Sequence, residues 1–458
     1  MRAFSDRFAR WFQKVLPSPF TIAVVLTAVA MVLAFAFGEE SSVSSTVLNW
    51  EKGLWNKGLL VFAFQMMLML VLGHVLALST PAERLISFIT SRILSSGAKA
   101  AASVAFFTML TGLFNWGFGL IFGAILARKV GEEAARRNIS INYPLIGAAG
   151  YTGLLVWHGG LSGSSLIKVA EDGHLASLME GAMSTAEIAQ LPASIGLSET
   201  VFSPMNLVAS LIILLVIPAF FYLSGKGEGQ KLRMDSGEER NQNEAESKGA
   251  ERLDTGRGVA MLTGLLFIGV AIYKPFTYES PGALLWINPN WINLLLFGLA
   301  LVFHGSVVKF LSALNHGILG ASGILVQFPL YFGIMGVITG SGLIDVFSEL
   351  MVISSNETTY PIFTFFSAAV VNVFVPSGGG QWAVQGAIII KAASELNIPL
   401  SKCILALAYG DQVTNMLQPF WALPLLGITG LKAKEILPYT LIAMMLAILV
   451  FVMVLLIF

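Results

Sequence analysis

Long apolar runs separated by short polar segments fill most of the chain. A membrane-spanning helix needs about 20 largely apolar residues, and stretches of that length recur from Thr21 to Phe458. The runs that we interpret as spans lie near residues 20–37, 58–78, 142–157, 203–223, 258–273, 291–307, 320–340, 402–423 and 441–458. The pattern therefore predicts an all-α polytopic membrane protein.

One segment breaks this pattern. Between Gly225 and Arg257 there are seven Lys or Arg and eight Asp or Glu residues and almost no apolar ones. Such a composition predicts a solvated linker without a core. We therefore divide the chain into an N-terminal segment, a first transmembrane repeat, a charged linker, and an extra span followed by a second repeat, at residues 1–18, 19–223, 224–257 and 258–458.

The two apolar halves repeat polar features in the same order. Gln65 and Gln327 are 262 positions apart, as are Ser79 and Ser341. Asn115 in "FNWGFG" precedes Asn372 in "VNVFVPSGGG" by 257, and Tyr151 precedes Tyr409 by 258. These nearly constant offsets indicate an internal duplication.

Basic residues give the orientation through the positive-inside rule. The N-terminus carries Arg2, Arg7, Arg10 and Lys14, and no small-residue cleavage site closes the first apolar run, so we interpret that run as an uncleaved span. With the basic cluster at 128–137 also inside, the segment near 100–127 must leave and re-enter the membrane on the cytoplasmic side. The segment near 361–391 would enter from outside. The sequence thus predicts an inverted-topology repeat with two re-entrant hairpins.

Each predicted hairpin tip is rich in glycine and amides. Irregular backbone at membrane depth must be buried in protein or line a cavity, and a helix N-terminus favours anions. We therefore expect the tips to bind an anion, although the same glycines also suit helix packing alone. The candidate substrate-binding residues are Asn115, Trp116, Gly117, Gly119, Asn372, Pro376, Ser377, Gly378, Gly379, Gly380 and Gln381.

A second pair of polar clusters follows the tips, inside apolar runs, which is typical of discontinuous helices at a site. Its candidate substrate-binding residues are His158, Gly159, Ser162, Ser164, Gln418 and Trp421. Its candidate positions for a coupling ion, either a proton or sodium, are Asp411, Gln412, Thr414 and Asn415. The alternatives are that Asp411 lies in a pore mouth or pairs with Lys391 or Lys402, and that His158 only packs.

Charge and composition exclude several function classes. Lys plus Arg equals Asp plus Glu at 27 each, which argues against a nucleic-acid partner. The single cysteine, Cys403, excludes an intramolecular disulfide. The sequence has no Walker motif to bind ATP, and we expect no cofactor and no metal beyond a coupling sodium ion. The sequence is compatible with a homo-oligomer.

The chain closely resembles the bacterial short-chain fatty acid transporter family, the carriers associated with acetoacetate and butyrate uptake. The residues that carry the likeness are "NWGFGLIFGA" (Asn115–Ala124), "GILVQFP" (Gly323–Pro329), "VPSGGGQW" (Val375–Trp382) and "QPFWALP" (Gln418–Pro424). The chain departs from the family pattern at His158, where a glycine is common, and at Asp411, where a glutamate is common. A more distant likeness links the family to the ion-transporter superfamily.

The resemblance implies a secondary active carrier of short monocarboxylates in the cytoplasmic (inner) membrane of a bacterium, and not an enzyme. The absence of a midplane arginine fits a singly charged substrate, because a dicarboxylate favours bidentate arginine. One alternative is a cation–proton antiporter, which would need spans richer in carboxylates. Another is an intramembrane serine protease with Ser162 as nucleophile and His304 as the nearest base.

Overall fold

The computed structural model is mainly helical in the part of the chain that it describes, with no β-strand there. It describes residues 18–38, 42–179, 183–227, 229, 249–277, 286, 289–318, 321–343, 346 and 356–458. The N-terminal basic residues and most of the charged linker lie outside the described residues. The predicted all-α polytopic architecture is confirmed.

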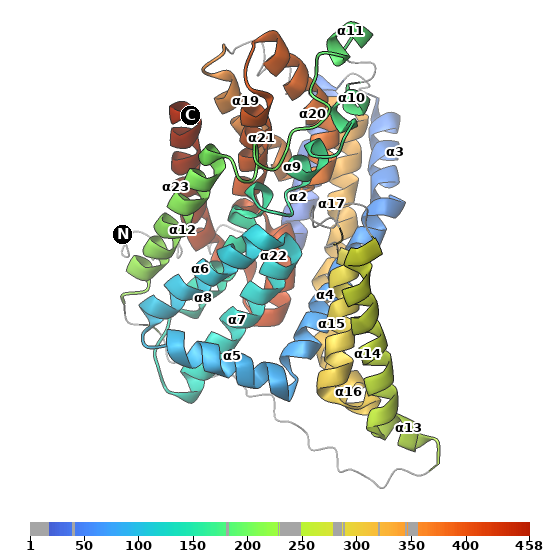
Figure 1. Ribbon diagram of the computed structural model, residues 1–458, viewed down its shortest axis with the longest axis vertical. Coiled ribbons are helices and arrows are strands. Elements are labelled where there is room, and N and C mark those ends of the chain that lie inside the picture. Colours follow the sequence, from blue (N-terminus) through green and yellow to red (C-terminus); the bar gives the residue numbers. More distant parts are fainter. Residues whose placement is uncertain are drawn as a thin grey trace.

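Helices from the start of the first half and from the start of the second half form one bundle, which we call the framework bundle. Its members are α2 (Pro19–Phe37), α3 (Val43–Leu54), α4 (Lys57–Ala77), α14 (Arg257–Tyr273), α15 (Pro289–His304), α16 (Val307–Ile318) and α17 (Ser322–Gly340). Helix α17 packs on α2, α3 and α4, and α15 packs between α4 and α14. In Figure 1 these helices run along one side of the molecule.

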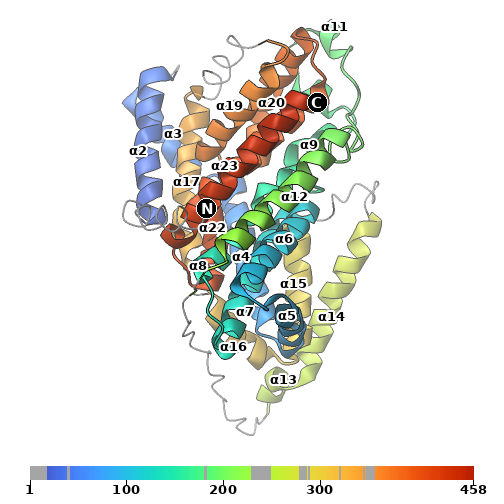
Figure 2. The same cartoon turned by 90° about the vertical axis from the view of Figure 1, so that its left-hand side faces the viewer.

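The interrupted helices form a second bundle, the broken-helix bundle. Its first-half members are α6 (Gly97–Phe114), α7 (Trp116–Arg136), α8 (Tyr143–Ala149), η1 (Thr152–Leu155), η2 (Trp157–Gly159), α9 (Ser164–Val169) and α12 (Pro204–Ser224). Its second-half members are α19 (Tyr360–Phe374), α20 (Gly378–Glu395), α21 (Leu400–Thr414), η6 (Asn415–Leu417), α22 (Pro419–Thr429) and α23 (Ala433–Ile457). Figure 2 shows α12 and α23 crossing one face of this bundle.

The element order is the same in the two halves of the broken-helix bundle. A helix pair meets at a short break, a second interrupted helix follows, and a long apolar helix comes last. The α6–α7 pair occupies the lower half of Figure 1 and the α19–α20 pair the upper half. This arrangement fits the predicted inverted repeat, whose membrane topology stays a prediction, as do the two re-entrant hairpins.

Small residues let the first helix pair close tightly. Asn115 ends α6 and caps α7, where its side chain accepts a hydrogen bond from the Phe118 N–H at 3.0 Å. A Cβ atom on Gly119 would lie 2.7 Å from the Gly112 backbone, so a side chain at Gly119 would push the two helices apart. Gly112 also faces the backbone of Gly153 in η1, which ties the hairpin to the next interrupted helix.

A separate helix joins the two bundles. Helix α5 (Thr80–Ile93) connects α4 of the framework bundle to α6 of the broken-helix bundle. An amphipathic helix of this kind suits the membrane interface, and Figure 1 shows α5 lying crosswise below α6 and α7. Short helices α10 (His174–Leu178) and α11 (Thr185–Ile188) lie at the other end, and α13 (Glu251–Thr255) precedes α14.

Among the described residues, five helices are long and apolar enough to cross a membrane, or up to six if the bent pair Val43–Val61 and Ala63–Leu76 counts as one span. The five are Phe20–Phe37, Gly97–Phe114, Pro204–Ser224, Arg257–Thr277 and Ala433–Ile457. Four of them overlap predicted spans, near 20–37, 203–223, 258–273 and 441–458, although the last helix begins eight residues earlier than predicted. The predicted spans near 142–157 and 402–423 are the interrupted helices, whose segments are individually too short.

The contact between Gly112 and Gly153 generates a stability prediction. A Cβ atom at Gly112 would lie 2.5 Å from the Gly153 carbonyl oxygen, a backbone atom that cannot rotate away. We expect Gly112→Ala to lower the free energy of unfolding by about 1–3 kcal/mol and the melting temperature in detergent. In the control Gly269→Ala, the new methyl group meets nothing within 4 Å, so helix propensity should leave stability equal or higher. Equal melting temperatures for the two variants would contradict the prediction.

Candidate functional site

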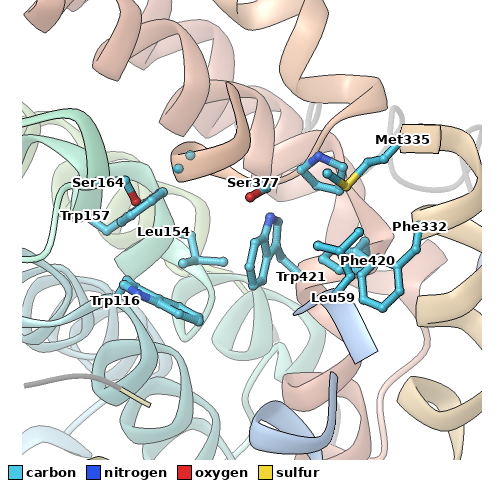
Figure 3. Close-up of a pocket in the computed structure, with 13 residues that line it drawn as sticks. Leu59, Trp116, Leu154, Trp157, Ser164, Phe332, Met335, Ser377, Phe420 and Trp421 are labelled. Carbon is cyan, nitrogen blue, oxygen red and sulfur yellow. The ribbon is translucent and has the colours of Figure 1, made fainter. Parts of the chain in front are cut away.

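A cavity of about 110 Å³ lies where the broken-helix bundle meets the framework bundle. Cavities of this order accommodate molecules of only a few heavy atoms. The residues that line it are Leu59, Trp116, Leu154, Trp157, Ser164, Phe332, Met335, Pro376, Ser377, Gly378, Gly379, Phe420 and Trp421. Three of these, Leu59, Phe332 and Met335, belong to the framework bundle, and the remainder come from the helix breaks (Figure 3).

The N-terminus of α20 forms the polar end of this cavity. Ser377 caps the helix by accepting a hydrogen bond from the Gly380 N–H at 3.2 Å. The N–H groups of Gly378 and Gly379 donate to no described atom of the chain. A Cβ atom on Gly379 would lie 4.0 Å from Ser164 Oγ, so that hydroxyl faces the same helix end. Two free backbone donors and two hydroxyl groups therefore converge at one point.

At the N-terminus of α7, by contrast, the protein itself binds two of the first three N–H groups. Ser162 Oγ accepts a hydrogen bond from the Trp116 N–H at 2.9 Å, and Asn115 caps the Phe118 N–H. A Cβ atom on Gly117 would lie 3.1 Å from the Met69 sulfur, so Gly117 faces α4. The two tips are therefore not equivalent, because only the tip at α20 offers its backbone donors to the cavity.

Three tryptophans form the apolar wall. Trp116 packs edge to face on Trp157 and Trp421, with ring centroids 6.2 and 5.4 Å apart. Phe420 continues the wall toward Phe332 of the framework bundle. Figure 3 shows the Ser164 and Ser377 hydroxyls above Trp116 and Trp421. The cavity thus has one polar end and one aromatic side, which suits an amphipathic molecule.

The break between α21 and η6 is held together by buried amides. Asn372 Nδ2 donates to the Asp411 carbonyl at 2.6 Å, to Thr414 Oγ1 at 3.0 Å and to Asn415 Oδ1 at 3.0 Å. Gln418 Nε2 donates in turn to the Asn372 carbonyl. Asn372 therefore fixes the shape of the second interrupted helix and does not line the cavity.

The two interrupted helices also bind one another. Gln412 Oε1 accepts hydrogen bonds from the N–H groups of His158 and Gly159, at 3.0 and 3.2 Å. Tyr151 Oη donates to the carbonyl oxygens of Asn415 and Gln418, which lie 2.8 and 3.0 Å away. Each helix thus supplies partners for backbone groups exposed by the break in the other.

A histidine and a carboxylate meet behind the cavity. His158 Nδ1 lies 3.3 Å from Asp411 Oδ1, and the two side chains are 0% and 1% exposed. His158 Nε2 accepts the Ser165 N–H at 3.2 Å and lies 3.0 Å from Ser165 Oγ. A Cβ atom on Gly378 would lie 3.3 Å from Asp411 Oδ2, so this pair adjoins the N-terminus of α20. Among the described residues, Asp411 forms no ion pair with Lys391 or Lys402, the partners considered from the sequence.

The predicted site residues therefore divide into two groups. Those that line the cavity are Trp116, Ser164, Pro376, Ser377, Gly378, Gly379 and Trp421. Those that lie around it, all buried except the half-buried Ser162 and Gly380, are Asn115, Gly117, Gly119, His158, Gly159, Ser162, Asn372, Gly380, Gln381, Asp411, Gln412, Thr414, Asn415 and Gln418. Gln381 is an example of the second group, because its amide donates to the Ala368 carbonyl at 2.9 Å, inside the hairpin.

Sequence reasoning missed several residues of the site. Leu59, Leu154, Phe332, Met335 and Phe420 line the cavity, but as apolar residues in apolar runs they carry no signal. Asn206 was also missed, although a polar residue in the apolar run of α12 could have been noticed. Its amide donates to the Gly159 carbonyl at 2.7 Å and its Oδ1 accepts from Tyr409 Oη at 3.1 Å.

Comparisons with known proteins show the family of the chain. The family model described as "Short chain fatty acid transporter" matches residues 1–458. Two curated relatives carry the name "Putative short-chain fatty acid transporter". The one from Escherichia coli (strain K12) is 34% identical over 98% of this chain and 97% of its own length, and the one from Haemophilus influenzae is 34% identical over 96% of both chains.

One solved structure, that of the Neisseria gonorrhoeae antimetabolite efflux pump MtrF, is 13% identical to this chain. The alignment covers 97% of this chain and 96% of that one, with a TM-score of 0.40. The match to the family model spans every residue, and the two curated relatives align almost end to end. The chain belongs to the short-chain fatty acid transporter family and is a multi-pass membrane transporter, not an enzyme.

Proposed function

We propose that this transporter is a secondary active carrier of short monocarboxylates such as butyrate and acetoacetate, in the inner membrane of a bacterium. The single observation that carries the proposal is the cavity at the α20 N-terminus, which joins unpaired backbone donors to an aromatic wall. A small carboxylate with a short acyl chain has the same division between a charged end and an apolar end.

The carboxylate would lie on the N–H groups of Gly378 and Gly379, with hydroxyl donors from Ser164 and Ser377. Unpaired N–H groups and the helix dipole both favour an anion at this place. No Lys or Arg is among the residues that line the cavity. This supports a singly charged substrate held by hydrogen bonds, because a dicarboxylate would leave its second charge without a partner.

The acyl chain would extend along the tryptophan wall toward the framework bundle. The cavity volume of about 110 Å³ leaves room for only a few carbon atoms. Leu59, Phe332 and Met335 close the far side, and all three belong to the framework bundle. The length of acyl chain that fits would therefore depend on how closely the two bundles approach each other.

The alternatives considered from the sequence gain no support. Ser162 Oγ accepts the Trp116 N–H instead of facing a histidine, and His304 Nε2 lies 2.8 Å from the Val75 carbonyl oxygen. Ser165, His158 and Asp411 are connected like a hydrolytic triad, but Ser165 is buried and does not line the cavity. A cation–proton antiporter would need further carboxylates, and the described residues hold no group of three or more His, Cys, Asp or Glu placed to share a metal ion.

Exchange in proteoliposomes tests the proposed substrate. Vesicles loaded with unlabelled butyrate should take up labelled butyrate through a saturable, protein-dependent route that acetoacetate inhibits and succinate does not. Protein-free vesicles give the baseline, because butyric acid itself crosses bilayers. Ser164→Ala should raise the half-saturating concentration about tenfold or more, since a hydrogen bond to a charged group contributes about 1.5–3 kcal/mol.

The matched control for that variant is Ser177→Ala, which removes an exposed hydroxyl in α10. It should leave the half-saturating concentration unchanged. Exchange by the folded wild-type protein at the rate of protein-free vesicles would overturn the proposed substrate. Equal effects of Ser164→Ala and Ser177→Ala would instead remove Ser164 from the carboxylate site.

The position of Met335 predicts a change in acyl-chain preference. Met335 lines the cavity from α17, so Met335→Ala should lengthen the apolar end by about three heavy atoms. We expect hexanoate to become a better competitor of labelled butyrate by about tenfold, because each buried CH₂ contributes about 0.8 kcal/mol. The control Met445→Ala changes a side chain that is 59% exposed on α23 and should not alter the order of competitors. An unchanged order in Met335→Ala would show that the acyl chain lies elsewhere.

A further inference from the structure

We infer that Oδ2 of Asp411 binds one proton whenever the carrier binds its substrate anion, and that His158 is a positioning residue that stays neutral. The inference rests on the proposed carboxylate site and specifies how that site is coupled. It is carried by three observations, namely the hydrogen bonds of His158, the unpaired oxygen of Asp411, and the position of that oxygen beside Gly378.

The hydrogen bonds of His158 fix its charge. A backbone N–H can only donate, so the Ser165 N–H at 3.2 Å requires Nε2 to be an acceptor without its own proton. The ring proton therefore lies on Nδ1, the atom that is 3.3 Å from Asp411 Oδ1. A doubly protonated ring would direct an N–H group at the Ser165 N–H. His158 Nδ1 forms no hydrogen bond with the described residues, so the neutral ring packs against the carboxyl group at 3.3 Å without supplying a full positive charge to it.

The second oxygen of Asp411 has no partner. Oδ2 is buried and forms no hydrogen bond within the described part of the chain. An ionised carboxylate in such surroundings is costly unless it is paired and hydrogen-bonded. A proton on Oδ2 removes that cost and converts the oxygen into a donor, which makes Oδ2 the atom where a proton is most favourable.

No other charged group in the described structure offsets Asp411. The elements packed against α21 carry the charged side chains Lys168, Lys391, Glu395, Lys434 and Glu435, and α21 itself carries Lys402. None of them pairs with Asp411, and Lys168 is bound to Glu171. At about 1.5 Å per residue, Lys402 lies about 13 Å along the helix from Asp411. The hydroxyl groups of Tyr151 and Tyr409 are bonded elsewhere.

The substrate anion would bring a second negative charge to this place. Its carboxylate would lie on the N–H groups of Gly378 and Gly379, and Asp411 Oδ2 lies 3.3 Å from where a Gly378 side chain would start. Two carboxylates this close cannot both remain ionised without a compensating charge. The substrate therefore binds the form of the carrier in which Asp411 is protonated, and one proton accompanies each substrate anion.

A sodium ion is the alternative occupant of this place, because hard cations require several oxygen ligands. Gln412 Oε1 is bound by the N–H groups of His158 and Gly159, and Asn415 Oδ1 is bound by Asn372 Nδ2. Asp411 Oδ2, Asn372 Oδ1 and Gln418 Oε1 are buried without a hydrogen-bond partner among the described residues. A proton needs only the carboxylate oxygen, whereas sodium would need the amide oxygens as well, and the replacement of sodium described below distinguishes the two.

The test measures proton uptake on substrate binding, so it does not depend on transport. Full-length protein in detergent is titrated with butyrate from about pH 6 to about pH 9. Tryptophan fluorescence reports the Kd, because three tryptophans line the cavity, and a pH indicator in weak buffer reports the protons taken up. For the wild type, uptake should approach one proton per butyrate at the alkaline end, and the Kd should rise there by nearly tenfold per pH unit.

Two variants and one salt exchange locate the proton. Asp411→Asn, which resembles the protonated carboxyl group in shape and charge, should still bind butyrate, with no proton uptake and a Kd that does not change with pH. His158→Gln should keep the proton uptake, because the proton lies on Asp411. Replacing sodium by choline at constant ionic strength should leave the wild-type Kd unchanged.

Several results would overturn the inference. Butyrate binding by the wild type without proton uptake would do so whether or not either variant folds. A Kd that depends on sodium would replace the proton with sodium, and loss of uptake in His158→Gln alone would transfer the proton to the imidazole. If the folded wild type binds no butyrate at any pH, the proposed substrate is wrong as well. The butyrate exchange experiment in proteoliposomes tests the substrate separately from the proton.

Discussion

The backbone groups exposed at buried helix breaks are the constraint on which the rest of this structure depends. A break leaves N–H and C=O groups without intrahelical partners, and in apolar surroundings each unpaired group costs free energy. Here each interrupted helix supplies the missing partners of the other. The Tyr151 hydroxyl donates to the carbonyls of Asn415 and Gln418, and Gln412 Oε1 accepts from the N–H groups of His158 and Gly159. Neither break is satisfied alone, so the two halves of the chain must assemble together.

The hydrogen-bond partner of each backbone group also separates groups that maintain the fold from groups that are free to bind a ligand. At α7 the N–H groups of Trp116 and Phe118 are used internally, because Ser162 and Asn115 accept them. At α20 Ser377 caps only the third residue of the helix, which leaves Gly378 and Gly379 unpaired beside the cavity. A serine in the neighbouring segment thus makes the two tips unequal. The anion end that we propose is the one at which two consecutive donors beside the cavity remain without a partner.

The helical class, the positions of the breaks and most of the polar residues around them were predictable from the sequence. Clusters of glycine, proline and amides are costly in a helix that continues unbroken through lipid, so such clusters inside apolar runs indicate breaks. The sequence could not predict which amides would be used internally. Asn372 and Gln381 resemble ligand-binding residues in the sequence, yet both bond to neighbouring helices. Nor could it identify Leu59, Phe332 and Met335, because an apolar residue that lines a cavity and one that faces lipid have the same sequence signature.

The division of the cavity wall between two bundles has a mechanical consequence. The polar end, the tryptophans and the His158–Asp411 pair all belong to the broken-helix bundle, whereas the framework bundle contributes only apolar side chains. A carrier must expose its site to each side of the membrane in turn. If the bundles slide against each other, the contacts that change are apolar ones that have no required geometry. The groups of the proposed anion site and of the proposed proton site would then move as one unit, so that substrate and proton remain paired throughout the movement.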